Sequence, residues 1–224
     1  CIIPPGDVGL VVLSEQQKNY LRGWHYQLMR RLFGRNLTVS EGPFWLRQRR
    51  MAQPAFHRQR LSEYSAVMVD EASKLASRWR GAASEQKPIE SRHEMSRVTL
   101  AIASRTLFDL DVSAEADEFG QAFAALGQYF DQRLKHPIGT PPLWVPTPMN
   151  RRFKRAVSTL NEKMAKIVRE RLCDQSDHGD LLSMFIQARD EETGERMSDD
   201  QLRSEVLNFL LAGYISVNPS KVSN

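Results

Sequence analysis

The sequence predicts a mainly α fold, organised as one domain over residues 1–224. Apolar residues recur at spacings of three and four along most of the chain, which is typical of helices that bury one face. Only residues 9–13 (GLVVL) have the short, β-branched composition of a strand. The apolar content of 41% suffices for one substantial core, and no apolar run approaches the roughly 20 residues that a membrane-spanning helix needs.

The N-terminal part should hold three helices after the strand. The first starts at Glu15, and the second covers residues 42–57, where Pro43 suits the first turn and Pro54 must bend or end the helix. The third ends before Gly81. Its apolar face is formed by residues at helical spacing, namely Leu61, Tyr64, Met68, Ala72, Leu75 and Trp79.

Apolar periodicity predicts four further helices, over residues 91–109, 114–135, 153–172 and about 179–189. Residues 136–149 contain five prolines, which favour an extended or turning loop over a helix. This loop therefore separates the second and third of these helices.

A last helix should begin after Ser198, because Ser198 and Gln201 have the spacing of a capping box. Its buried face would be formed by Leu202, Val206, Phe209, Leu210 and Gly213. Residues 214–224 (YISVNPSKVSN) are polar and lack helical periodicity. We therefore expect them to be a non-native tail, for example from a frameshift, a retained intron or a misjudged gene end.

Charge and cysteine content narrow the functional classes. The 31 Lys and Arg against 27 Asp and Glu give a net charge of +4, but the acidic residues are interspersed, which argues against nucleic-acid binding. Cys1 and Cys173 have neither a disulfide framework nor a metal-ligand spacing. We expect no metal site, a reducing compartment and a cytoplasmic location for this segment, with a membrane anchor upstream of Cys1 left open.

Trp45 and Arg49 are the first candidate binding residues. Four residues apart on a helix, they lie on one face one turn apart, where an indole N–H and a guanidinium reach the same anionic group. The pair therefore indicates a carboxylate-binding site. The alternative is an ordinary core tryptophan beside a surface arginine.

Several segments resemble the cytochrome P-450 family. Trp45, three residues and Arg49, set behind SEG and followed by QPAF, resemble the C helix, where such a pair binds a haem propionate. In the same order along the chain, similarity to the E helix, the G helix and the H to I helices falls on residues 93–112, 151–172 and 180–213. The resemblance covers about residues 6–213 and implies a cytochrome P-450 fold fragment, about the B to I helices, with a short N-terminal strand.

The end of the last helix resembles the family's oxygen-binding stretch. The resemblance implies that Ala212 and Gly213 are cofactor-binding residues that leave room for dioxygen over the haem. The family's acid and threonine, which help to deliver protons, correspond to Ile215 and Ser216. Ser216 is thus the one catalytic candidate, without its acidic partner. The alternative is that the two small residues merely pack helices together.

The resemblance implies a haem-dependent monooxygenase that inserts one oxygen atom from dioxygen into an apolar organic substrate, using b-type haem. It also implies an acidic electron donor, a ferredoxin or a flavoprotein reductase, docking near the C-like helix. Arginines that would receive this donor are Arg30, Arg31, Arg35, Arg47, Arg50, Arg58 and Arg60. An ordinary solvated basic face explains the same arginines.

The family's ligand cysteine lies in a glycine-rich loop that has no counterpart in these residues, and neither Cys1 nor Cys173 is a candidate for that role. One alternative is therefore a truncated, non-catalytic fragment that does not retain haem. A second alternative is a basic helical interaction module.

Overall fold

The computed structural model describes residues 23–136, 141–174, 176–190 and 194–215. In chain order its helices are α2 (Trp24–Phe33), α3 (Gly42–Ala52), α4 (Arg58–Ser84), α5 (Ser91–Phe108), α6 (Ala116–Lys135), α7 (Pro148–Cys173), α8 (Leu181–Gln187) and α9 (Asp199–Ile215). Two short 3-10 helices, η3 (Gln53–Phe56) and η4 (Ser113–Glu115), join α3 to α4 and α5 to α6. None of the helices in these ranges combines the length and the hydropathy that a bilayer crossing needs.

The mainly α prediction is confirmed. Within the described ranges there is no strand, only an isolated antiparallel bridge between Arg189 and Arg196. The strand predicted at residues 9–13 and the helix predicted from Glu15 lie outside the described residues. Helix α2 was not predicted, because its basic residues interrupt the apolar pattern of a short segment.

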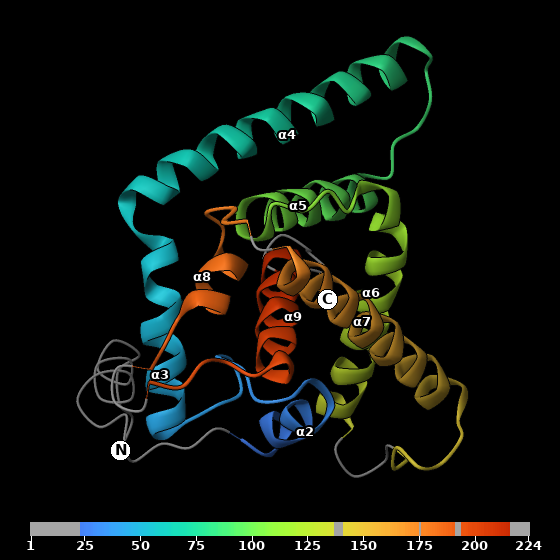
Figure 1. Cartoon of the computed structure of the whole chain (residues 1–224). Helices are drawn as coiled ribbons and strands as arrows, with labels where there is room; N and C mark the ends of the chain where they lie inside the picture. The colour runs from blue at the N-terminus through green and yellow to red at the C-terminus, as the bar shows by residue number, and fades with distance from the viewer. Residues whose placement is uncertain (1–22, 137–140, 175, 191–193, 216–224) are drawn as a thin grey trace, which may run out of the picture.

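Helix α9 occupies the centre of the fold and packs against α5, α7 and α8 (Figure 1). The largest fully buried side chains come mainly from the helices around it: Tyr129, Phe108, Phe119, Phe153, Phe185, Leu100, Leu126, Leu160, Met164, Leu181, Leu182 and Leu202. Burial of these side chains supplies most of the favourable free energy of folding.

The predicted capping box of α9 is confirmed. The Ser198 amide donates to Gln201 Oε1 at 3.0 Å, and the Gln201 amide donates to Ser198 Oγ at 3.3 Å. The expected loss of helical structure after Gly213 is wrong for Tyr214 and Ile215, which continue α9. Tyr214 is buried with its ring 4.8 Å from that of Phe123, so its aromatic surface extends the apolar stripe. The prediction that residues 214–224 are a non-native tail is not tested by this and stays a prediction.

Helix α4 differs from its prediction in two ways. It continues past Gly81 to Ser84, because one exposed glycine costs a helix only about 1 kcal/mol and does not end it. Its apolar face is only partly buried: Tyr64 and Leu75 are in the core, whereas Leu61 and Met68 are 49% and 44% exposed. Figure 1 shows the reason, since α4 crosses over α5 and is covered only along part of its length.

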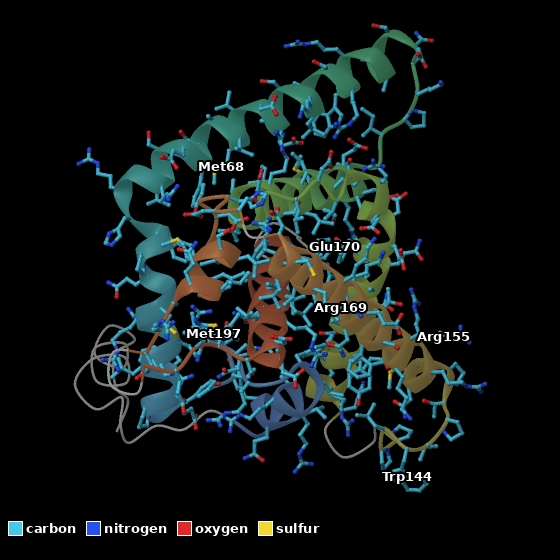
Figure 2. The ribbon with its side chains drawn as sticks, viewed as in Figure 1. Met68, Trp144, Arg155, Arg169, Glu170 and Met197 are labelled. Carbon is cyan, nitrogen blue, oxygen red and sulfur yellow. The ribbon has the colours of Figure 1, made fainter. Side chains whose placement is uncertain are left out.

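The proline-rich loop ends earlier than predicted. Pro148 is the first residue of α7, and Thr147 caps the helix by accepting the Asn150 amide at 3.1 Å. The buried Asn150 side chain also donates to the carbonyl oxygens of Pro142 and Val145, both at 2.8 Å. These bonds fix residues 142–147, from which Trp144 projects with 79% of its surface exposed (Figure 2).

Candidate functional site

Helix α3 carries the predicted anion-binding pair. The Arg49 guanidinium carbon lies 5.1 Å from the centroid of the Trp45 ring, a cation–π contact across one helical turn. Trp45 is half-buried and Arg49 is exposed. The two side chains therefore lie together on one flank of α3, and their role as an anion-binding pair stays a prediction.

The far end of α3 is held against α9 through η3. Phe56 stacks on Phe209 of α9, with 5.9 Å between the ring centroids, and Phe209 lies 5.9 Å from Phe185 of α8. Tyr64 donates its hydroxyl to the Ala55 carbonyl at 3.2 Å. The flank with the tryptophan and arginine is thus fixed relative to the central helix.

The segment that leads into α3 is fastened to α9 at a second point. Gly34 has φ +81°, and a Cβ there would collide with Ser204 Oγ, so only glycine fits. The Leu37 amide donates to Glu205 Oε2 at 3.1 Å. Asn36 Oδ1 accepts the amides of the two residues after Leu37, at 3.1 and 3.3 Å, which closes the turn.

Glu205 is a buried carboxyl group on the central helix that the sequence reasoning missed. It is 1% exposed, and burial raises the pKa of the Glu205 carboxyl to about 7, against the opposing effect of the Leu37 amide. Its Oε1 has no hydrogen-bond partner among the described residues. An acidic residue inside the apolar stripe between Leu202 and Phe209 was the signal in the sequence.

The two small residues near the end of α9 have different surroundings. Ala212 is exposed. A Cβ on Gly213 would lie 2.6 Å from the Cβ of Ala103, so the absence of a side chain lets α9 approach α5 closely. This contact favours a packing role for Gly213, and its role beside an oxygen site stays a prediction. Ser216 lies outside the described residues.

A buried ion pair joins three helices near the core. Arg171 of α7 donates to Asp180 Oδ2 at 2.6 Å, to Ser183 Oγ at 3.2 Å and to the Phe108 carbonyl at 2.6 Å. Arg171 and Asp180 are 7% and 4% exposed. Asp180 also caps α8 by accepting the Ser183 amide at 2.7 Å. Local sequence patterns do not indicate this pairing, because Arg171 belongs to α7 and Asp180 to the start of α8.

Several arginines of the predicted docking face take part in contacts within the chain. Arg30 donates to the Val39 carbonyl at 2.7 Å, and the Arg35 guanidinium lies 4.0 Å from the centroid of the Phe44 ring. Arg47 pairs with Asp190 and Glu195, each at 3.5 Å. These arginines therefore stabilise contacts within the chain, whether or not a partner protein binds.

Metal-ligating side chains do not gather in the described part of the chain, where no group of three or more His, Cys, Asp or Glu residues is placed to hold an ion. Cys173 is a free, exposed thiol at the end of α7.

The sequence profile named Cytochrome P450 matches residues 9–216. The chain belongs to the cytochrome P450 family. It is 32% identical over 193 residues to cyclooctat-9-en-7-ol 5-monooxygenase of Streptomyces melanosporofaciens, a match over 86% of this chain and 41% of that protein. It is 29% identical over 194 residues to pentalenene oxygenase of Streptomyces avermitilis, over 85% of this chain and 41% of that protein.

The P450 fold is also evident in three dimensions. The crystal structure of the cytochrome P450DA heme domain superposes with a TM-score of 0.72 and 28% sequence identity, over 91% of this chain and 45% of that chain. The predicted P450 fold fragment is therefore confirmed. The chain spans about two fifths of the length of the curated P450 relatives it matches.

Proposed function

We propose that this chain forms part of a haem-dependent monooxygenase that inserts one oxygen atom from dioxygen into an apolar organic substrate. The observation that carries the proposal is the P450 match over residues 9–216. Two similar proteins are named a monooxygenase and an oxygenase, which supports this reaction class. When bound, b-type haem supplies the activation of dioxygen.

The exposed flank of α3 fits one end of such a cofactor. Haem carries carboxylate groups on an apolar ring, and Trp45 and Arg49 present two hydrogen-bond donors, one of them charged, within contact distance of each other. On α9, Ala212 contributes a small, exposed apolar surface. We assign the propionate to Trp45 and Arg49 and the ring face to Ala212, with Gly213 allowing α9 to lie against α5.

Proton delivery in this chain would rest on a hydroxyl group without an acidic neighbour. Ile215 neither donates nor accepts a side-chain proton, and Ser216 Oγ is the one side-chain oxygen of the pair. We propose that Ser216 passes protons from solvent. Proton delivery should therefore be slower in this chain than in a protein with a carboxylate at position 215.

The basic flank near α3 supports the proposal of an acidic electron donor. Arg49 and Arg50 are both exposed near the C-terminal end of α3. Positive charge here would steer an acidic ferredoxin or flavoprotein domain toward α3, with an on-rate that falls as salt increases.

The decisive experiment uses the longer protein of which we propose that this chain is a part. After reduction and addition of carbon monoxide, this protein should show the difference band of a haem thiolate. The Arg49→Gln substitution should weaken hemin binding by about tenfold, because an exposed charge-assisted hydrogen bond contributes about 1.4 kcal/mol. Arg80→Gln, on the exposed surface of α4, is the matched control. Absence of the thiolate band from this longer protein would contradict the proposal.

A parallel measurement on the 224-residue chain tests the alternative of a non-catalytic fragment. The chain contains only Cys1 and Cys173, and a propionate contact to Arg49 does not replace an axial ligand. With added hemin and reductant we expect no thiolate band and no hydroxylation. A clear thiolate band from these residues would overturn the exclusion of Cys173 as the ligand.

A further inference from the structure

His178 lies in the connection between α7 and α8, with its imidazole ring between two carboxylates. Its Nε2 is 2.8 Å from Oδ2 of Asp174, which follows the last residue of α7. Its Nδ1 is 3.3 Å from Oδ2 of Asp109, which follows the last residue of α5. Gln175, which lies outside the described residues, has no ionisable side chain. The ring therefore joins the connection to the ends of two helices.

The positions of the two carboxylates require a hydrogen on each ring nitrogen. An ionised carboxylate only accepts hydrogen bonds, whereas a neutral imidazole has one N–H and one lone pair. Ser176 Oγ also lies 2.8 Å from Nε2, but it donates its own hydrogen to Asp174 Oδ1 at 2.7 Å. In a neutral ring, one nitrogen would therefore present its lone pair to a carboxylate oxygen. Both contacts are favourable only for the imidazolium form of His178.

Cations from two helices lie near the ring or its connection. Desolvation and the charge of Arg171 on α7 oppose protonation of His178, although Arg171 Nη1 donates to the buried Asp180 at 2.6 Å. Arg60 of α4 lies beside the next residue of the connection, where a Cβ on the glycine would be 3.2 Å from its Nη1. The hydrogen bonds to Asp174 and to the second carboxylate outweigh these effects, so the pKa of His178 lies above its usual value.

Residues 176–179 make few other hydrogen bonds to the body of the fold. The Ser176 amide donates to Asp174 Oδ1 at 3.1 Å, and the His178 amide donates to Ser183 Oγ at 3.3 Å. The next residue is held differently, because Asp180 is 4% exposed, pairs with a buried arginine and accepts the Ser183 amide at 2.7 Å. Loss of the ring contacts would therefore free residues 176–179 without freeing the start of α8.

We propose that His178 is a proton-operated clasp, which as imidazolium holds residues 176–179 against the ends of α5 and α7 and on losing its proton releases them. Asp180 keeps α8 in place in both states. Release occurs as the pH rises, which is the direction required when the favourable contacts belong to the protonated form. The clasp does not depend on haem binding, so its test is separate from that of the proposed monooxygenase.

Nuclear magnetic resonance of the nitrogen-15-labelled 224-residue chain measures both parts of the proposal. The ring nitrogen shifts give the pH midpoint of His178, and amide hydrogen exchange reports the release. As the pH passes this midpoint, exchange of the Ser176 and His178 amides, corrected for its intrinsic pH dependence, should accelerate by about fivefold or more relative to the Ser183 amide. A ratio that stays constant across the midpoint would overturn the proposal.

Substitutions test whether the ring proton causes the release. His178→Gln cannot become a cation, so its exchange ratio should be high at every pH. His93→Gln removes a histidine that is 3.0 Å from the single carboxylate of Asp117, and it should behave like the wild type. Asp109→Asn keeps an acceptor and should lower the midpoint of His178 and the pH of release together. Glu205 titrates in all these proteins, so its contribution cancels. A wild-type ratio in His178→Gln, or a release that does not follow the shifted midpoint, would refute the clasp.

Discussion

Replacing Glu205 by glutamine should remove a large part of the pH dependence of folding stability. In the folded chain the carboxyl is 1% exposed and accepts one backbone N–H, from Leu37. Burial therefore favours the protonated form, and the pKa rises from its ordinary 4.5 to about 7. The unfolded chain exposes Glu205 to water, where its carboxyl ionises at the ordinary pKa.

The sign of the effect follows from which state binds the proton. Between the unfolded and folded pKa values of Glu205, the folded chain holds the proton and the unfolded chain has released it. The contribution of Glu205 to stability is therefore greatest below about pH 4.5 and falls as the pH rises toward 7. At about 1.4 kcal/mol per pH unit, this interval corresponds to a loss of about 3 kcal/mol of unfolding free energy.

Urea unfolding followed by circular dichroism, between about pH 5 and pH 8 at constant ionic strength, measures this loss. Glu205→Gln keeps the acceptor for the Leu37 amide and carries no titrating proton, so its stability should fall much less over this range. Glu170→Gln, on the exposed face of α7, should behave like the wild type.

A second group titrates with the same sign and must be separated from Glu205. Hydrogen bonds to Asp174 and Asp109 raise the pKa of His178, so its stabilising effect is also lost as the pH rises. The difference between wild type and Glu205→Gln isolates the buried carboxyl, because His178 is present in both. Parallel pH curves for these two proteins would refute the reasoning.

Two further substitutions test packing around the central helix. Arg171→Met should lower the unfolding free energy by about 3 to 5 kcal/mol, because it leaves the buried Asp180 carboxylate without its partner. Chemical denaturation measures this loss of stability, and a loss under about 1 kcal/mol would contradict the prediction. Gly213→Val should cost about 1 to 3 kcal/mol, because its Cβ would lie 2.6 Å from that of Ala103. Thermal unfolding should show a lower melting temperature for this variant than for Ala212→Val, which changes the exposed neighbouring position. Equal melting temperatures would show that α9 and α5 are not in close contact.

Local signals in the sequence sufficed for most helices. The capping box at Ser198 and Gln201 and the proline that opens α7 act over a single turn, so the sequence alone locates them. Tyr214 was grouped with the polar residues that follow it in the sequence, yet its ring continues the buried stripe of α9.

Burial is harder to predict than helical structure. Leu61 and Leu75 occupy equivalent positions in the apolar periodicity of α4, yet the first is 49% and the second 8% exposed. The difference depends on where α5 crosses α4, which is a property of the whole fold. The Leu37 to Glu205 bond, between residues 168 apart in the chain, is similarly invisible to local patterns.

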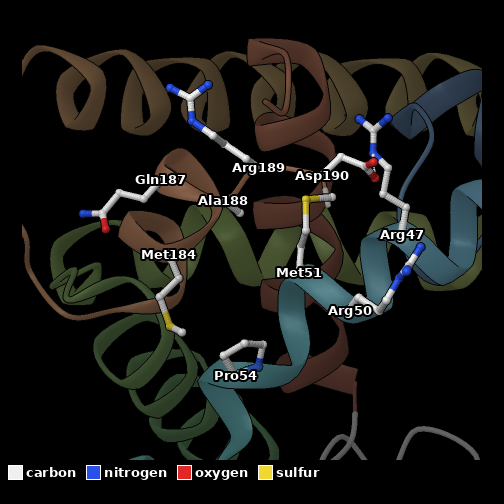
Figure 3. Close-up of a pocket in the computed structure, with 9 residues that line it drawn as sticks. All are labelled: Arg47, Arg50, Met51, Pro54, Met184, Gln187, Ala188, Arg189 and Asp190. Carbon is white, nitrogen blue, oxygen red and sulfur yellow. Dashed lines mark ion pairs between the residues drawn. The ribbon is translucent and has the colours of Figure 1, made fainter. Parts of the chain in front are cut away.

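Helix α3 shows how far residue spacing determines a binding site. The interval between Trp45 and Arg49 predicts their contact, because a helix brings residues four apart together. The same helix places Arg47 and Arg50 on another flank, where they line a cavity with Met184 and Ala188. The spacing of residues along α3 predicts on which flank each arginine lies. The cavity beside Arg47 and Arg50 forms only because α8 lies opposite that flank (Figure 3). One short arginine-rich helix therefore presents arginines on two flanks, and residue spacing alone indicated the first as a predicted binding site.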